Sequence, residues 1–223
     1  MVIITPDREM PLCMHCGKAK GTRHCPALNG YICSRCCGEG RGVEIDCPSS
    51  CSYYRRHEGY QRERLGPEFR KRWLFHNEEL YRKRRERLFD FILFLEWLIY
   101  RYYRERTRGT DREIREALEF AGRQLGPLVV VEGLVRPELG EYLLQGIEDY
   151  LEQFGMGEEE ARAGVEATIS FLEEFSGEDE NPRRYLQGLM GHVERDFDLP
   201  EEEEEPPRLI ITPDQLREEL NRR

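Results

Sequence analysis

Long apolar runs are scarce in this sequence. The longest, from Leu88 to Ile99, is interrupted by Asp90 and Glu96 and is too short to cross about 30 Å of hydrocarbon. Residues 1–7 also lack the basic and then apolar pattern of a secretory signal peptide. We therefore expect a soluble, cytoplasmic protein that makes no contact with a membrane.

The motifs of several enzyme classes are absent. The sequence contains no phosphate-binding P-loop, no G-x-G-x-x-G after a strand, no G-x-S-x-G nucleophile elbow and no H-E-x-x-H signature. His57, His76 and His192 are isolated in the sequence, and each is more typical of a surface or core histidine than of a catalytic one. We expect a non-enzymatic protein with no catalytic residue and no small-molecule substrate.

Lysine is rare, and the charges are unevenly distributed. The net charge is −10, yet residues 54–112 hold 17 Lys and Arg against 10 Asp and Glu, whereas residues 113–223 hold 11 against 29. Basic residues interleaved with aromatic ones are typical of nucleic-acid surfaces. The candidates are Arg55, Arg56, Arg82, Lys83, Arg84 and Arg85. The competing interpretation is a solvated helix neutralised by the chain's own acidic half.

Cysteine is absent after residue 51, but residues 13–51 contain all eight cysteines of the chain. The eight cysteines follow the pattern C-x2-C-x8-C-x7-C-x2-C-C-x9-C-x3-C. In a reducing compartment such a cluster indicates metal ligands more than disulfides. Eight thiolates are enough for two closed tetrahedral zinc sites, while an iron–sulfur cluster is the main competitor. We expect Gly17 and Gly38 to provide positive φ angles beside the C-x2-C pairs.

The cysteine segment resembles the binuclear, interleaved zinc fingers of the HIT and MYND type. The resemblance covers about 40 residues and rests on Cys13-x2-Cys16, on residues 23–26 (Arg-His-Cys-Pro) and on residues 31–36 (Tyr-Ile-Cys-Ser-Arg-Cys). The chain departs from those families with a single Cys25 in place of a pair and with Cys47-x3-Cys51 in place of His-x3-Cys.

The resemblance implies two Zn²⁺ ions per chain. The first site would use Cys13, Cys16, Cys33 and Cys36, and the second Cys25, Cys37, Cys47 and Cys51. His15 and His24 are possible substitutes, but eight cysteines already satisfy two metals, so we interpret both as bystanders. Zinc fingers of these families mostly mediate contacts between proteins, so the resemblance also implies a protein-interaction module.

The rest of the chain predicts an all-α bundle, so the expected fold class is mainly α with a small zinc module at the N-terminus. We divide the chain into residues 1–53 (zinc-binding module), 54–108 (basic and aromatic helical region), 109–200 (acidic bundle) and 201–223 (acidic linker and docking segment). Helices are expected from Pro67 to Arg106, Thr110 to Gln124, Pro137 to Phe154, Glu158 to Phe175 and Pro182 to Phe197, with weaker helical character at 128–131.

The two ends of the sequence share one segment. Ile-Ile-Thr-Pro-Asp occurs at residues 3–7 and again at residues 210–214. Thr-Pro-Asp is typical of a cap that enters a helix, and equivalent short docking strands are the alternative. The leading functional hypothesis is a cytoplasmic adaptor that binds a protein partner of unidentified nature. The alternative is a nucleic-acid-associated regulator that binds RNA or DNA through the zinc module and residues 55–108.

Overall fold

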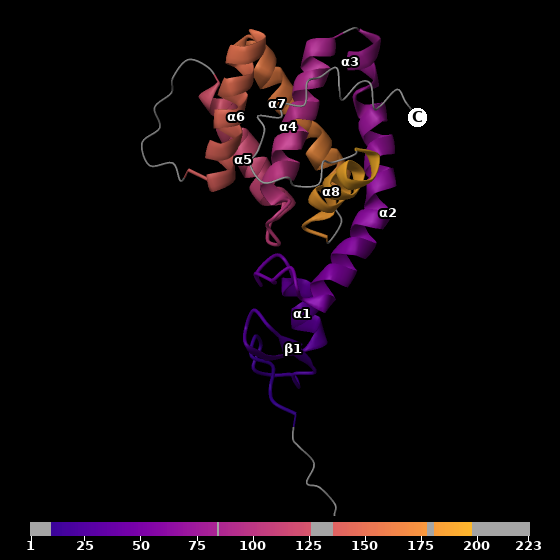
Figure 1. The fold of residues 1–223 in the computed structure, drawn as a ribbon, viewed down its shortest axis with the longest axis vertical. Helices are drawn as coiled ribbons and strands as arrows, with labels where there is room; N and C mark the ends of the chain where they lie inside the picture. Colours follow the sequence, from indigo (N-terminus) through magenta and orange to yellow (C-terminus); the bar gives the residue numbers. More distant parts are fainter. Residues whose placement is uncertain (1–9, 84, 126–135, 178–180, 198–223) are drawn as a thin grey trace, which may run out of the picture. The chain divides into compact units, whose positions relative to one another are not determined.

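The computed structural model describes residues 10–83, 85–125, 136–177 and 181–197. In these residues it contains eight helices and one two-stranded sheet (Figure 1), which confirms the mainly helical fold class. The antiparallel strands are β1 (Arg23–Cys25) and β2 (Gly30–Ile32). The helices are α1 (Ser34–Gly40), α2 (Ser52–His76), α3 (Glu78–Arg82), α4 (Glu86–Tyr103), α5 (Asp111–Gln124), α6 (Glu138–Phe154), α7 (Glu158–Ser176) and α8 (Arg184–Asp196).

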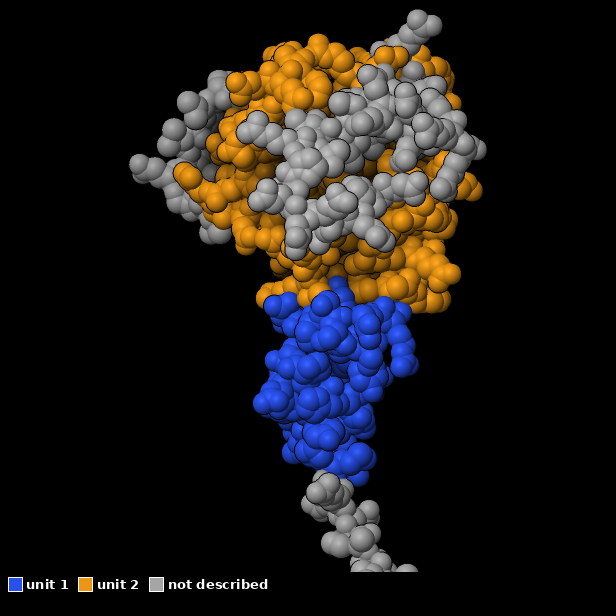
Figure 2. All heavy atoms as spheres, viewed as in Figure 1, with its two compact units in different colours: residues 1–57 blue, residues 58–223 orange. Residues whose placement is uncertain are grey.

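The chain forms two compact units. Residues 1–57 make up unit 1 and residues 58–223 make up unit 2 (Figure 2), so the boundary lies within α2. All eight cysteines belong to unit 1, and five of them are buried. No helix in the described parts of the chain is long and apolar enough to cross a membrane.

Helix α4 is at the centre of unit 2. It packs against α6, α7 and α8, while α5 packs against α6 and α7. Its side chains are buried almost all round, and Phe91, Leu95 and Ile99 have no exposed surface. A helix that is apolar on all sides needs neighbours on all sides, and these helices provide them.

The helix ends follow the local signals in the sequence. Thr110 and Glu113 form a reciprocal capping box at the start of α5, as predicted. Gly155 ends α6 with a φ of 59°, in the left-handed region that glycine enters without strain. The sequence therefore fixes these boundaries locally, before tertiary packing contributes.

The predicted start of a helix at Pro67 is wrong. Helix α2 begins fifteen positions earlier, at Ser52, and Pro67 is exposed in its interior. Proline removes one intrahelical hydrogen bond, but Leu65 and Phe69 on either side are fully buried and hold the helix together. Helix α2 ends where the Asn77 side chain donates to the Trp73 carbonyl over 3.1 Å.

Glu96 and Asp111 are two of the four acidic residues that are buried in the described part of unit 2, beside Glu58 and Asp90. Glu96 accepts hydrogen bonds from Trp73 Nε1 at 2.8 Å and from the Tyr185 hydroxyl at 3.4 Å, and burial raises its pKa to about 8. Asp111 accepts from the backbone N–H groups of Tyr185 and Leu186 at 2.8 and 3.0 Å, which caps the start of α8 from another helix. Burial raises the pKa of Asp111 to about 6 despite these bonds.

Several expectations concern residues outside the described ranges. They are the helical character of residues 128–131, the acidic linker and docking segment at 201–223, and both copies of Ile-Ile-Thr-Pro-Asp at 3–7 and 210–214. These remain predictions from the sequence.

Candidate metal centre

Two short local structures bring four of the eight cysteines together. Cys13 and Cys16 lie in a turn in which Gly17 N donates to Cys13 O over 2.8 Å and Gly17 has a φ of +64°, as predicted for this glycine. Cys33 is the N-cap of α1 and Cys36 lies in its first turn. Gly38 lies inside α1, so the positive φ predicted there is wrong. The hairpin β1–β2 connects the two structures in the chain.

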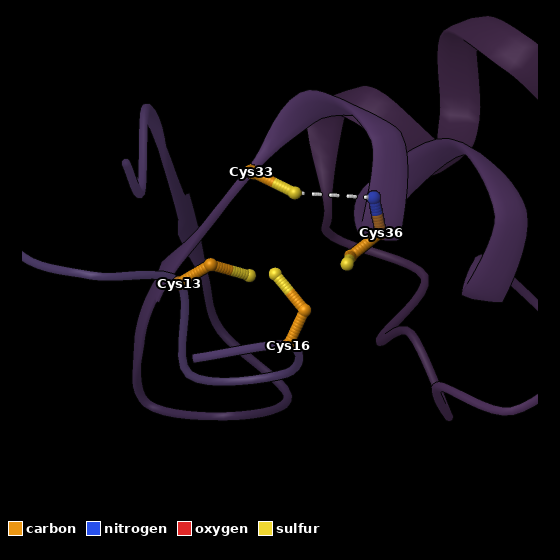
Figure 3. Close-up of side chains that lie close together, drawn as sticks. All are labelled: Cys13, Cys16, Cys33 and Cys36. Carbon is orange, nitrogen blue, oxygen red and sulfur yellow. Dashed lines mark hydrogen bonds between the residues drawn. The ribbon is translucent and has the colours of Figure 1, made fainter. Parts of the chain in front are cut away.

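The four sulfurs fit a single metal ion. The Sγ atoms of Cys13, Cys16, Cys33 and Cys36 all lie within 4.8 Å of one another, and Figure 3 shows the side chains pointing toward one another. In a tetrahedron with Zn–S bonds of about 2.3 Å, sulfurs lie about 3.8 Å apart. A contraction of less than about 1 Å therefore makes the cluster a four-coordinate thiolate site.

The local electrostatics shifts the pKa values of the clustered thiols in opposite directions. Burial works against ionisation of Cys13, but backbone N–H groups of Cys16, Cys33 and His15 outweigh it and lower its pKa to about 6. Hydrogen bonding to Cys33, burial and hydrogen bonding to Cys16 and Cys13 raise the pKa of Cys36 to about 12. Without a cation, the first thiolate therefore opposes formation of the last one. A divalent cation removes this repulsion and favours four thiolates.

The remaining cysteines do not form an equally tight group. Among the described residues, only Cys13, Cys16, Cys33 and Cys36 meet the 4.8 Å spacing. Cys25 and Cys47 are nevertheless buried, and Cys37 and Cys51 pack against the same cluster. Burial raises the pKa of Cys47, and the thiols of Cys51, Cys25 and Cys37 raise it further by charge repulsion. The four thiols thus share one neighbourhood at distances longer than a metal site needs.

The histidines have other partners. His15 Nε2 lies 3.3 Å from a Glu44 carboxylate oxygen, and the His24 ring packs edge-on against Tyr31. In unit 2, His76 pairs with Glu174 and His192 with Asp196, both at 2.6 Å. Neither His15 nor His24 belongs to the tight thiol group.

The basic candidates fall into two groups. Arg82 pairs with Glu78 at 3.2 Å and Lys83 with Glu79 at 2.8 Å, both at i,i+4 spacing, so both charges are locally neutralised. Arg84 lies outside the described residues. Arg55, Arg56 and Arg85 are exposed. The stretch with the highest positive charge in the sequence therefore presents less of that charge than its composition predicts.

Sequence analysis missed an apolar surface on unit 1. Met10, Leu12, Met14 and Tyr31, which we call the module face, are 51, 60, 61 and 46 % exposed. The first three lie within five residues of the chain, on either side of the buried Cys13, and Met14 is in the turn that carries Cys16. The Met14 sulfur would lie 1.9 Å from a Cβ at Gly30, so it covers that glycine, and Met14 N donates to Tyr31 O over 2.9 Å.

Three comparisons bear on the identity of the chain. No family model, no curated protein and no solved structure matches it.

Proposed function

We propose that this protein is a non-enzymatic, cytoplasmic adaptor whose N-terminal unit is held by zinc and binds a protein partner through the module face. The observation that carries the proposal is the exposure of four large apolar side chains on a unit of 57 residues. Burying one such side chain contributes about 1.5–3 kcal/mol, and contiguous exposed apolar surface is typical of protein-binding sites.

The thiol cluster supports this role by making the unit rigid. Chain segments this short seldom fold by apolar burial alone, and the core around Ile32, Ile45 and Tyr54 is small. Four thiolates complete a tetrahedral shell, so a bound metal keeps no position for water or substrate. A closed site of this kind stabilises the fold and supplies no hydrolytic chemistry.

We further propose that zinc is the ion and that Cys25, Cys37, Cys47 and Cys51 hold a second one. The second site is supported by the packing of these four thiols in one neighbourhood. Four thiols are also enough for one tetrahedral ion, so no histidine is required. Elemental analysis of protein purified without added metal tests both points. Two zinc per chain and no visible absorbance are expected. Iron with visible absorbance would contradict the zinc assignment, and one zinc per chain would contradict the second site.

Partner binding is tested with variants of the module face. In the full chain, Leu12→Ser together with Met14→Ser should abolish association with the native partner while zinc content and helicity stay unchanged. Tyr53→Ser is the matched control, because Tyr53 is 40 % exposed, belongs to the same unit and lies outside the module face. The readout is the set of proteins cross-linked to the chain in its own cells. An unchanged set in the double variant would refute the module face as the binding surface.

Nucleic-acid binding is the second candidate, and one observation favours it. Along α2, Arg64 and Lys71 are exposed, and neither forms an ion pair within the described part of the chain. Exposed Tyr60 lies on the same side of the helix. This candidate predicts binding of RNA or DNA that weakens steeply with salt and is lost in Arg64→Glu/Lys71→Glu. No binding at low salt would exclude it.

A further inference from the structure

Helix α2 carries an exposed row in unit 2 that is basic in the middle and apolar at one end. Its members are Tyr60, Arg64, Lys71, Leu74 and Phe75, and all five are exposed. At 100° per residue they lie within about a third of the helix circumference, and at 1.5 Å per residue they extend over about 22 Å. We call them the α2 row. Glu63 and Glu68 lie at its two edges, and Glu68 pairs with Arg72 and Arg184.

The charges of the α2 row differ from those of the basic residues around it. Arg62 pairs with Glu194, Arg70 with Asp196 and Arg72 with Glu68. Arg64 donates to Gln61 at 2.9 Å, which leaves its charge uncompensated, and Lys71 has no ion pair in the described residues. A row of two uncompensated cations beside two exposed apolar side chains matches a segment that is acidic and then apolar.

The chain itself contains such a segment. Residues 201–205 are five consecutive glutamates, residues 206–207 are both proline, and Leu209, Ile210 and Ile211 follow. We propose that this C-terminal segment binds the α2 row of its own chain, with the glutamates against Arg64 and Lys71 and the apolar trio against Leu74 and Phe75.

The point at which the described chain ends supports binding within one molecule. Helix α8 ends at Asp196, which lies 3.9 Å from Arg70 Nε. The Phe197 ring packs edge-on against His192, and His192 in turn contacts Phe69 in a tilted arrangement, with 5.7 Å between ring centroids in both contacts. The described chain therefore ends at the level of Phe69 and Arg70, in the middle of the α2 row's length. Figure 1 shows α8 beside α2, and Gly191 meets the Arg62 backbone there.

The distances are compatible with this attachment. A helix with its side chains is about 10–12 Å wide, so half its circumference is about 17 Å. Five extended residues cover about 17 Å, which brings the first glutamates around α2 to Lys71. Because the attachment is short, the segment is present at millimolar effective concentration. Weak exposed ion pairs are then sufficient to keep the segment bound to the α2 row most of the time. A free polyanion would have to compete with the segment for Arg64 and Lys71.

Zero-length carbodiimide cross-linking of the full chain tests the proposal, since it joins amines to carboxylates in contact. The chain has four lysines, Lys18, Lys20, Lys71 and Lys83. At low salt we expect links from Lys71 to residues 201–205, a loss of these links at about 0.5 M salt, and an about fivefold lower yield in Arg64→Glu. Lys83, exposed and paired with Glu79, is the control within the same chain.

Four results would overturn the proposal. The first is the absence of a Lys71 link when acetylation shows that Lys71 is reactive. The second is a yield of links to residues 201–205 that is as high from Lys83, or from the two lysines of unit 1, as it is from Lys71. The third is a Lys71 link found only between chains in a mixture of ¹⁴N- and ¹⁵N-labelled protein, which would assign the segment to a second copy. The fourth is a yield of Lys71 links to residues 201–205 that stays the same at about 0.5 M salt and in Arg64→Glu, which would show that charge attraction does not hold the segment on the α2 row.

Discussion

Replacing Glu96 by glutamine should stabilise unit 2 at neutral pH. The glutamine keeps an acceptor for Trp73 Nε1 and for the Tyr185 hydroxyl, and it removes a carboxyl group that is only 4 % exposed. Glu96 has a pKa of about 8 in the folded chain, against an ordinary 4.5. Between these two values the native state holds a proton that the unfolded state has released.

The sign and size of the effect follow from this difference. Stability falls by about 1.4 kcal/mol for each pH unit between the unfolded and folded pKa values, and it is constant outside that window. The stability contributed by the protonated carboxyl is thus fully present below pH 4.5 and is lost as the pH rises toward 8. At pH 7 the glutamine variant should be more stable by about 3 kcal/mol, and near pH 4.5 the two proteins should be equal.

Urea unfolding followed by tryptophan fluorescence measures this effect. Both tryptophans, Trp73 and Trp97, belong to unit 2, so the signal reports that unit without interference from the thiols of unit 1. The difference in unfolding free energy between the two proteins should grow from pH 5 to pH 8. A difference that does not change with pH would refute the assignment of a raised pKa to Glu96.

Three further perturbations have expected outcomes. Gly191→Ala puts a Cβ against the Arg62 backbone oxygen and should lower the free energy of unfolding in urea by about 3 kcal/mol. Gly59→Ala has open space at its Cβ and should raise the free energy of unfolding by about 1 kcal/mol. Equal effects of the two variants would contradict the close contact of α8 with α2. Asp111→Ala leaves two buried N–H groups at the start of α8 without acceptors and should lower the thermal midpoint of unit 2 at a cost of about 3 kcal/mol. Cys13→Ser should remove one metal equivalent and leave the unfolding of unit 2 unchanged, measured by elemental analysis and tryptophan fluorescence; retention of all metal would exclude Cys13 as a ligand.

The helices of unit 2 were largely predictable because their signals are local. The capping box of Thr110 and Glu113 and the glycine at position 155 identified real helix ends. The start of α2 was missed because Pro67 is a strong local signal, and the packing of Phe69 against aromatic side chains of α7 and α8 overrides it. These packing contacts involve residues more than 100 positions away in the sequence, so local sequence periodicity cannot predict them.

The candidate site was predictable in part. The two C-x2-C pairs of the first thiol group were visible in the spacing, and the structure brings their sulfurs together. The module face was not visible, because Met10, Leu12 and Met14 alternate with polar and sulfur residues in a segment too short to show a period. The i,i+4 spacing of Glu78 with Arg82 and of Glu79 with Lys83 is visible in the sequence, and the structure forms both ion pairs. Composition alone could not separate compensated charges from uncompensated ones.

The thiol group also determines the secondary structure next to it. Helix α1 has seven residues, and its N-cap is Cys33, whose sulfur accepts a hydrogen bond from Cys36 N at 3.4 Å. An isolated helix of this length does not persist in water. Release of a metal and melting of α1 are therefore expected to be a single event, hidden in whole-chain circular dichroism by the helices of unit 2. Amide hydrogen exchange at Cys36 and Cys37 would reveal it, so these two amides report the thiol state of the whole unit.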